Sequence, residues 1–538
     1  MTDVSWWRGA VIYQIYPRSF LDTNGDGVGD LPGIIQRLDY VASLGVDAIW
    51  VAPFFRSPMA DFGYDIADYR DVDPLFGTLE DFDSLLAKAH GLGLKVMIDQ
   101  VLSHTSDQHA WFKESRESLG NAKADWYVWA DAKPDGSPPN NWLSIFGGSA
   151  WQWEPRRGQY YLHNFLASQP DLNFHHPEVR TAVLDNVRFW LDKGVDGLRL
   201  DAINFCFHDR QLRDNPPKPK ERRVGRGFSP DNPYAFQYHL YNNTQPENLD
   251  FLGDLRALLD RYPSAVTLGE ISSEDSLATM AEYTRGHRLH MGYSFELLSS
   301  DFSAAYIRRT VAQLEAQVSE GWPCWAISNH DVERVLTRWG NGNTSPRLAN
   351  LLTAMLCSLR GSVCVYQGEE LGLTEAEVPF EALRDPYGIT FWPNFKGRDG
   401  CRTPMPWNEG PFAGFSPVAP WLPIDEAHKA LAVTHQEANA NSVLHGFRRF
   451  MHWRAAQSAL RQGDIRFLDV PEPILAFVRH DGSGQVLAAF NLGKLPQTVA
   501  LAGFDAATPL EGHGLQQGTL QSGQLELPGH GVLFARIA

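Results

Sequence analysis

Short apolar runs rich in β-branched residues alternate with longer amphipathic runs through most of this 538-residue chain. At 177–193 and 247–262 the apolar residues recur at helical spacing, and Thr78 with Asp81 forms a capping-box-like start for another helix. The strand-like runs lie at 11–16, 48–53, 95–101, 197–201, 266–270, 291–295, 324–329 and 363–367. This alternation predicts repeated βα units, whose parallel strands belong to one sheet.

Eight such units in one chain predict an α/β fold, a closed (β/α)8 TIM barrel. Residues 105–175, after the third strand, are rich in Trp, Asn, Gly and Pro and too long for a plain connection, so we expect an inserted subdomain. Short alternating runs at 474–478, 486–491 and 531–536 predict a C-terminal all-β sandwich. The expected domains are a barrel at 1–104 and 176–461, an insertion at 105–175 and a sandwich at 462–538.

Composition narrows the class of protein. The formal net charge of −17 argues against nucleic-acid and anionic-membrane partners, because both require a basic surface. The five cysteines are odd in number and form no CxxC pair, which indicates reduced thiols rather than a disulfide framework or a zinc site. No secretory signal or membrane-spanning run is visible, so we expect a cytoplasmic location. The oligomeric state stays open.

Three strand-like runs end close to a carboxylate: Asp201, Glu270 and Asp331. The carboxyl ends of barrel strands meet at one mouth, where such enzymes have their active sites. Paired carboxylates there suit glycoside hydrolysis, which needs a carboxylic acid and an ionised partner. The alternative is a set of unrelated ion pairs at loop starts.

Each carboxylate has an expected environment. Arg199 lies two residues before Asp201 and on the same face of the strand, so we expect it to lower the pKa of Asp201. A nucleophile must be ionised in this way. Glu270 requires a raised pKa in order to protonate a leaving oxygen. Asp331 is expected to hold sugar hydroxyls and to help keep Glu270 protonated.

A loop early in the chain alternates oxygen ligands with turn-forming glycines, like the first half of an EF-hand. The side chains of Asp22, Asn24, Asp26 and Asp30, with the Val28 carbonyl, predict a structural Ca²⁺ site, and Ca²⁺ suits it better than Mg²⁺, which keeps several waters. The closing glutamate of an EF-hand is absent. A loop held by Asx turns alone is the alternative, and we expect no organic cofactor.

The strand-end segments resemble the signature regions of glycoside hydrolase family 13, the α-amylase family. They are DQVLSH (99–104), GLRLD (197–201), GEI (269–271) and SNHD (328–331). The resemblance implies that Asp201 is the nucleophile, Glu270 the acid/base and Asp331 the transition-state stabiliser. It also implies that His104 and His330 donate hydrogen bonds to the sugar that is cleaved.

Further segments are similar to α-glucosidases and oligo-1,6-glucosidases within that family. They are DFGYD (61–65), QPDLN (169–173) and GRDGCRTPMPW (397–407). The resemblance implies that Tyr64 stacks on the terminal glucose and that Asp61 and Arg402 bind its 4-hydroxyl side. An Asp61–Arg402 pair would close the pocket behind one sugar, with Phe165 in its lining; a surface ion pair is the alternative.

Two positions depart from the family pattern. Ser103 replaces the usual Asn before His104, which argues against the calcium site of true α-amylases. Ala202 follows the nucleophile, where relatives that prefer α-1,6 bonds usually carry valine, so this chain favours α-1,4 bonds.

The expected activity is that of a retaining, exo-acting α-glucosidase that acts on short α-glucosides and transfers glucosyl groups to acceptor alcohols or sugars. Retention predicts that the carboxyl groups of Asp201 and Glu270 lie about 5–5.5 Å apart. The alternatives are an oligo-1,6-glucosidase and a sucrose- or trehalulose-directed relative. A non-catalytic binding homologue is disfavoured, because all three acids are present.

Overall fold

The computed structural model describes residues 5–223, 231–318, 320–342, 345–504 and 506–537. Within this part of the chain, eight parallel strands close into a barrel in the order β1-β13-β12-β11-β10-β9-β5-β2. They are β1 (Val11–Ile15), β2 (Ala48–Val51), β5 (Lys95–Val101), β9 (Gly197–Asp201), β10 (Val266–Glu270), β11 (Met291–Ser294), β12 (Pro323–Trp325) and β13 (Ser362–Tyr366). Each strand lies at a predicted position, so the predicted barrel is confirmed.

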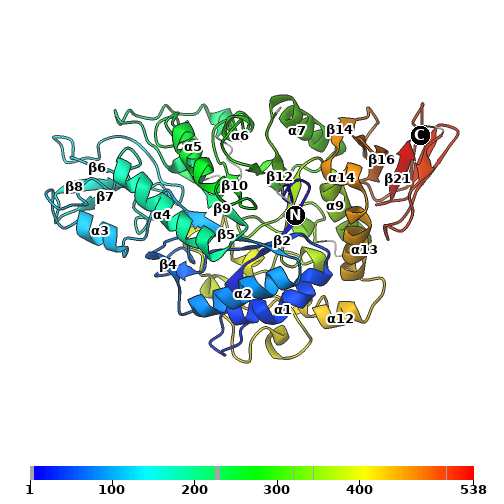
Figure 1. Cartoon of the computed structure of the whole chain (residues 1–538), viewed down its shortest axis with the longest axis horizontal. Helices are drawn as coiled ribbons and strands as arrows, with labels where there is room; N and C mark the ends of the chain where they lie inside the picture. The colour runs from blue at the N-terminus through cyan, green and yellow to red at the C-terminus, as the bar shows by residue number, and fades with distance from the viewer. Residues whose placement is uncertain (1–4, 224–230, 319, 343–344, 505, 538) are drawn as a thin grey trace.

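Helices surround the barrel (Figure 1). Those that follow the strands are α1 (Leu31–Ser43), α2 (Leu79–Gly91), α4 (Pro177–Lys193), α5 (Asn248–Leu259), α6 (Ser276–Tyr283), α7 (Ala304–Gln317), α9 (Pro346–Ser358) and α13 (Val443–Ala455). The predicted capping box is present, because the Thr78 hydroxyl accepts from Asp81 N and the Asp81 carboxylate accepts from Thr78 N. Helix α4 has the predicted bounds and stops at Gly194, whose φ of 99° is accessible to glycine without strain.

Strand β12 is shorter than the predicted run at 324–329. Beyond Trp325 the chain bonds to side chains instead of the neighbouring strand: Asn329 Oδ1 accepts from Asp331 N at 2.9 Å, and Ser328 Oγ accepts from Val335 N at 2.9 Å. These local bonds turn the chain at the barrel mouth, where Asp331 lines the cavity.

Two antiparallel units interrupt the βα repeat. The pair β3 (Phe55–Arg56) and β4 (Asp68–Val72), which we did not predict, follows β2, and its connecting loop carries Asp61 and Tyr64. Between β5 and α4 lie α3 (Ala110–Ser115) and a sheet of β6 (Trp129–Ala130), β8 (Gln159–Leu162) and β7 (Trp151–Glu154), in that order. This sheet belongs to the expected insertion.

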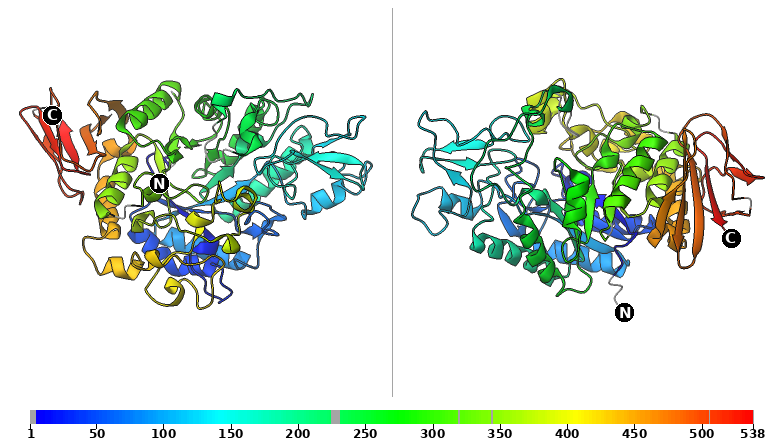
Figure 2. Two further views of the ribbon diagram at one scale, coloured as in Figure 1. Left: turned by 180° about the vertical axis from the view of Figure 1, so that it is seen from behind. Right: turned by 90° about the horizontal axis from the view of Figure 1, so that it is seen from above.

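The C-terminal part consists of two antiparallel sheets, as predicted. One has the order β14-β15-β16-β21-β18 and the other β17-β20-β19. The strands are β14 (Asp464–Phe467), β15 (Ile474–Asp481), β16 (Gly484–Asn491), β17 (Gln497–Ala500), β18 (Thr508–Pro509), β19 (Thr519–Gln521), β20 (Gln524–Leu527) and β21 (Val532–Ile537). Figures 1 and 2 show these sheets and the β6–β8 insertion at opposite ends of the molecule, with the barrel between them. Among the described residues, no helix is both long and apolar enough to cross a bilayer.

Candidate active site

A cavity of about 760 Å³ opens at the carboxyl ends of the barrel strands. The predicted site residues in its lining are Asp61, Tyr64, His104, Phe165, Asp201, Glu270 and Asp331. The other three predicted residues, Arg199, His330 and Arg402, are at most 1% exposed and contact the lining from behind. The structure therefore gathers all ten around one cavity, in two layers.

Arg199 is the centre of the acidic cluster. Its guanidinium contacts Asp201 Oδ1 at 2.7 Å, Glu270 Oε2 at 2.8 Å and Asp99 Oδ1 at 2.9 Å. Asp99 and Arg199 lie on the neighbouring strands β5 and β9, where they are directly paired in register. One buried cation thus holds the two candidate reacting carboxyl groups beside each other, with a third acid behind them.

The two carboxyl groups differ in their proton affinity. The pKa of Glu270 is raised to about 8, chiefly by burial and also by the negative charges of Asp201 and Asp331, while Arg199 opposes part of this rise. Glu270 is therefore largely protonated at neutral pH. The predicted lowering of the Asp201 pKa is wrong: burial raises it, and Arg199 offsets only part of that effect.

A backbone hydrogen bond links Ala202, the residue after Asp201, to Glu270. Ala202 has φ of 41° and ψ of 44°, a left-handed conformation that is uncommon for residues with a Cβ. Its N–H donates to Glu270 Oε2 at 2.9 Å. The strained turn after β9 therefore aims a backbone donor at the acid/base candidate.

Asp331 is the strongly ionised acid of the site. Arg402 Nη2 lies 2.8 Å and Arg398 Nη1 3.2 Å from its Oδ1. Burial would raise the pKa of Asp331, but His330 and these two guanidiniums hold it well below the usual range. This firmly ionised group in turn raises the pKa of Glu270.

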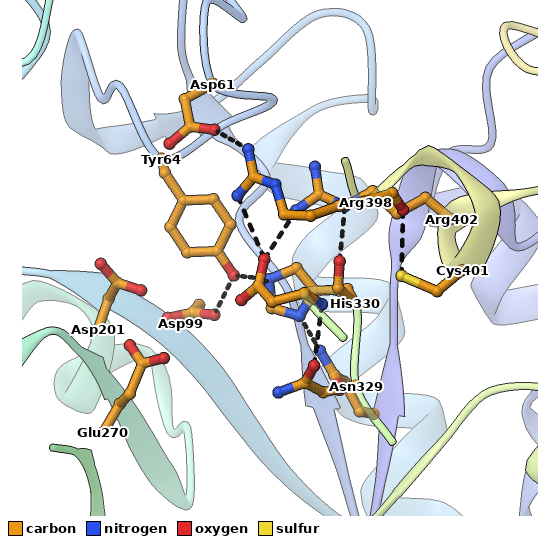
Figure 3. Close-up of polar contacts among 12 residues, drawn as sticks. Asp61, Tyr64, Asp99, Asp201, Glu270, Asn329, His330, Arg398, Cys401 and Arg402 are labelled. Carbon is orange, nitrogen blue, oxygen red and sulfur yellow. Dashed lines mark hydrogen bonds and ion pairs between the residues drawn. The ribbon is translucent and has the colours of Figure 1, made fainter. Parts of the chain in front are cut away.

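The ion pair that closes the pocket differs from the prediction. Asp61 Oδ1 contacts Arg398 Nη2 at 2.9 Å, and not Arg402, whose Nη2 is bound to Asp331 (Figure 3). Arg398 also contacts Asp385 Oδ1 at 2.8 Å, and that side chain is fully buried. The expected Asp61–Arg402 pair is therefore corrected to Asp61–Arg398. Arg398 and Arg402 both stand in the segment at 397–407, and nothing in the sequence of that segment indicates which guanidinium contacts Asp61.

Tyr64 and His330 form a stacked pair, with ring centroids 5.5 Å apart. Tyr64 Oη donates to Asp99 Oδ2 at 3.0 Å, so His330 Nε2–H donates to Tyr64 Oη at 2.6 Å. The other ring nitrogen, Nδ1, accepts from Gln14 Nε2 at 2.7 Å. Burial lowers the pKa of His330 to about 3, so the ring is neutral and its tautomer is set by its neighbours.

His104 is also held neutral, because burial lowers its pKa to about 4. Its Nε2 lies 3.1 Å from the Tyr64 carbonyl oxygen and 3.3 Å from Gln169 Nε2. Gln169 in turn donates to Asp61 Oδ2 at 3.2 Å. Gln169 and Asp99 are thus members of the site that sequence reasoning did not select, although each stands inside a quoted segment.

The loop at 22–30 lies outside the cavity lining, as far as the described residues go. The Asp22 carboxylate accepts from three backbone N–H groups, those of residues 24, 25 and 27, and from the Ser416 hydroxyl. Asp30 accepts from Gly33 N at 2.7 Å and caps α1. In the described part of the chain, no three acidic, histidine or cysteine side chains form a metal-binding group. A cation here would need the oxygens of Asn24 and the Val28 backbone as well.

A barrel whose mouth holds one protonated and one ionised carboxyl group beside a sugar-sized cavity defines a glycoside hydrolase. The family described as "Alpha amylase, catalytic domain" matches residues 14–463, and the chain belongs to this family. The resemblance predicted from the sequence is therefore confirmed.

Its relatives belong to the α-glucosidase and oligo-1,6-glucosidase group. The chain is 56% identical to a probable alpha-glucosidase of Rhizobium meliloti (strain 1021), over 100% of this chain and 98% of the relative. It is 37% identical to an oligo-1,6-glucosidase of Heyndrickxia coagulans, over 91% and 92% of the two chains. Among solved structures, an alpha-glucosyl transfer enzyme, XgtA, is 68% identical with a TM-score of 0.98, over 99% of each chain.

Proposed function

We propose that this chain is a retaining, exo-acting α-glucosidase that prefers α-1,4 bonds and passes part of the released glucosyl to acceptor alcohols or sugars. The observation that carries the proposal is the Arg199 bridge between Asp201 and Glu270, at 2.7 and 2.8 Å. Glu270 has a pKa of about 8 and keeps its proton, while the positive charge of Arg199 favours the ionised form of Asp201. Those are the two states that glycoside cleavage requires.

In the first step, an ionised Asp201 oxygen attacks the anomeric carbon. The bond from that carbon to the glycosidic oxygen breaks, and the Glu270 proton goes to the departing oxygen, which leaves as an alcohol. Asp331 remains ionised between Arg398 and Arg402 and stabilises the positive charge that develops on the sugar ring.

In the second step, Glu270 acts as the base. Once Asp201 is esterified its negative charge is gone, so one of the contributions that raise the pKa of Glu270 disappears. Glu270 can then take a proton from water or from an acceptor hydroxyl as that oxygen attacks the anomeric carbon. The ester bond breaks, the Asp201 carboxylate returns, and two inversions give net retention.

The exo action rests on the closed end of the cavity. Asp61, Arg398 and Tyr64 form that end, and Asp61 and Tyr64 lie in the loop between β3 and β4. Behind them the fully buried Asp385 anchors Arg398, so the Asp61–Arg398 ion pair forms the proposed barrier to a further sugar on this side. The non-reducing glucose therefore occupies the closed end, and the leaving group points towards the open one.

The preference for α-1,4 bonds rests on Ala202, whose small side chain lines the cavity next to the nucleophile. Initial rates on maltose, isomaltose and sucrose test it, and faster turnover of isomaltose would overturn it. Similarity to an alpha-glucosyl transfer enzyme supports the transfer reaction.

Product analysis tests the whole proposal. The purified protein is incubated with 4-nitrophenyl α-glucoside and an alcohol acceptor, and ¹H NMR follows the anomeric configuration of the first products. The nitrophenol leaving group adds no second glucose to the signal. We expect α-glucose and an α-glucoside of the alcohol. An initial excess of β-glucose would show inversion and refute the mechanism.

We further propose that the loop at 22–30 binds Ca²⁺. Support comes from Asn24 and Asp26: among the described residues, the Asp26 carboxylate accepts from Val28 N and the Asn24 side chain alone, so it keeps free lone pairs. The melting temperature should be higher in Ca²⁺ than in EGTA, and equal values would contradict the site. A cytoplasmic location is also proposed, supported by five buried free cysteines, and cell fractionation tests it.

A further inference from the structure

The long connection between β9 and α5 forms part of the wall of the cavity that Glu270 also lines. Tyr234, Tyr238, His239 and Asn243 of this connection line the cavity together with Ser272–Ser276 after β10, and we call these four residues the acceptor wall. Residues 224–230 of the connection lie outside the described part of the chain. Because the proposed function places the glucose at the Asp61–Arg398 end, we take this wall as the surface that contacts the leaving group and the acceptor.

The acceptor wall is attached to the segment after β10 by Glu274. Its Oε1 accepts from His239 N at 3.0 Å, and its Oε2 contacts Lys218 Nζ at 2.8 Å. Within the connection, Lys218 N donates to the Phe236 carbonyl at 2.7 Å. One edge of the wall is therefore fixed by an ion pair and backbone bonds.

The other edge is held by a chain of buried amides that ends on Asp171 of the insertion. Asn215 Nδ2 donates to Asn242 Oδ1 at 2.9 Å, Asn242 Nδ2 donates to Asn164 Oδ1 at 2.8 Å, and Asn164 Nδ2 donates to Asp171 Oδ2 at 2.5 Å. All four residues are at most 2% exposed. We call Asn215, Asn242, Asn164 and Asp171 the amide chain.

Asp171 determines the direction in which each hydrogen bond of the amide chain is donated. Asp171 Oδ2 also accepts from the backbone N–H of Asn164 at 3.1 Å, so this oxygen is an acceptor. Burial raises the pKa of Asp171, and a proton on this group would occupy Oδ1, which has no hydrogen-bond partner among the described residues. Asn164 must therefore present its oxygen to Asn242, and Asn242 must present its oxygen to Asn215.

The far end of the amide chain organises the wall directly. Asn215 Oδ1 accepts from the backbone N–H groups of Leu240 and Tyr241, at 3.0 and 3.1 Å. These residues directly follow His239, and Asn242 directly precedes Asn243, so the amide chain holds the segment that carries half of the acceptor wall. The Asp171 end lies close to the glucose side, because residue 171 pairs with His104 in an antiparallel bridge.

We propose that Asn242 is a positioning residue: through the fixed polarity of the amide chain it places the acceptor wall, and so determines how the glucosyl-enzyme partitions between acceptor and water. The inference rests on the proposed function, since it concerns the second step of that reaction. None of the four residues of the amide chain takes part in bond making or breaking. Each amide acts by holding the next, and a displacement of about 1 Å at the wall is enough to cost a large factor in rate.

Two variants of the same residue test this role. Asn242→Asp keeps the shape of the side chain and the oxygen that accepts from Asn215 Nδ2. It replaces Nδ2, which donates to Asn164 Oδ1, by a second oxygen. Asn242→Leu removes the bonds to Asn215 and Asn164 and also the contact with His239 Nδ1. Asn141→Asp is the matched control, because exposed Asn141 bonds the backbone of Asn215 at the surface, where water can replace the lost donor.

The assay uses maltose with an alcohol acceptor and measures glucosylated alcohol against hydrolysed donor. At pH 7.5 we expect both Asn242 variants to lower this ratio by roughly tenfold, while the control stays within about twofold. On acidification, the carboxyl group introduced by Asn242→Asp gains a proton that it can donate to Asn164 Oδ1. As the pH falls, the transfer ratio of the aspartate variant should therefore approach that of the wild type measured at the same pH, whereas the ratio of the leucine variant should not.

The titratable groups around Asn242 are His239 and Tyr234, which contact its side chain, and Asp171 and Glu274, which lie further away. His239 Nδ1 lies 3.2 Å from Asn242 Oδ1, and burial lowers the pKa of His239 to about 4, so its ring is neutral above that pH. Asp171 is reached only through Asn164, and Glu274 is paired with Lys218. Asp171 and Glu274 keep these partners in both variants, whereas only the aspartate variant keeps an oxygen that faces His239 Nδ1.

Melting temperatures over the same pH range provide a second readout that needs no substrate. The aspartate variant should gain stability relative to the leucine variant as the pH falls, even if it folds poorly at neutral pH. Wild-type transfer ratios in both variants, or identical pH dependence of the two in ratio and melting, would overturn the inference. A wild-type protein that does not cleave maltose would instead refute the proposed function, while the melting comparison would still test the amide chain.

Discussion

Replacement of Glu270 by glutamine removes the proton that the first step delivers while preserving the shape of the side chain. With a pKa of about 8, roughly nine-tenths of Glu270 is protonated at pH 7, whereas a carboxyl group at the ordinary value of 4.5 would be protonated to well under about 1%. Proton delivery by a positioned group contributes about 10²–10⁴ to the rate. We expect Glu270→Gln to lose about that factor in kcat/KM on maltose, whose leaving group needs the proton.

The assay compares maltose with 4-nitrophenyl α-glucoside, whose leaving group departs without protonation. The value of kcat/KM reports the first step alone, so the loss on the nitrophenyl substrate should be at least about tenfold smaller than on maltose. Wild-type kcat/KM on maltose should fall above about pH 8, where Glu270 loses its proton, and this limb should be absent from the variant on the nitrophenyl substrate. Equal losses on both substrates would refute the assignment of Glu270 as the acid.

The same substitution has a consequence for stability. Because the pKa of Glu270 is higher in the folded state (about 8) than its ordinary value of 4.5, the unfolded chain loses this proton first as the pH rises. The folded protein therefore loses stability between those two pH values, by up to about 5 kcal/mol in total, and Glu270→Gln abolishes this loss. The melting temperature of the variant should rise relative to wild type from pH 5 to pH 8; a constant difference would show that burial does not raise the pKa.

Three further substitutions test other parts of the site. Asp201→Asn should abolish turnover of maltose without lowering the melting temperature, and retained activity would contradict its role as nucleophile. In double-mutant cycles of KM, Asp61→Ala should couple to Arg398→Ala by about 0.5–3 kcal/mol and less to Arg402→Ala, because of these two arginines it is Arg398 that contacts Asp61. The opposite order would restore the sequence-based pairing. Ala202→Val should raise the isomaltose-to-maltose rate ratio and lower stability by about 1–2 kcal/mol, since a β-branched residue fits a φ of 41° poorly; an unchanged ratio would remove this position from bond selection.

Much of this molecule follows from its sequence read locally. The alternation of short apolar runs with helical spacing is a property of neighbouring residues, and it predicts the barrel strands, the bounds of α4 and the capping box of α2. The convergence of Asp201, Glu270 and Asp331 follows as well, because a closed parallel barrel brings all its carboxyl strand ends to one mouth. The loop between β3 and β4 gave no such signal, since strands of a few residues have too little periodicity.

The partners and protonation states in the site were decided by the tertiary structure alone. Arg398 and Arg402 stand four residues apart in one segment, and only the path of that segment over the barrel mouth turns one to Asp61 and the other to Asp331. The pKa of Asp201 depends on the summed burial from surrounding strands as well as on Arg199, and burial outweighs the nearby cation. Ion pairing and desolvation depend on distances between segments far apart in the chain, which no local pattern encodes.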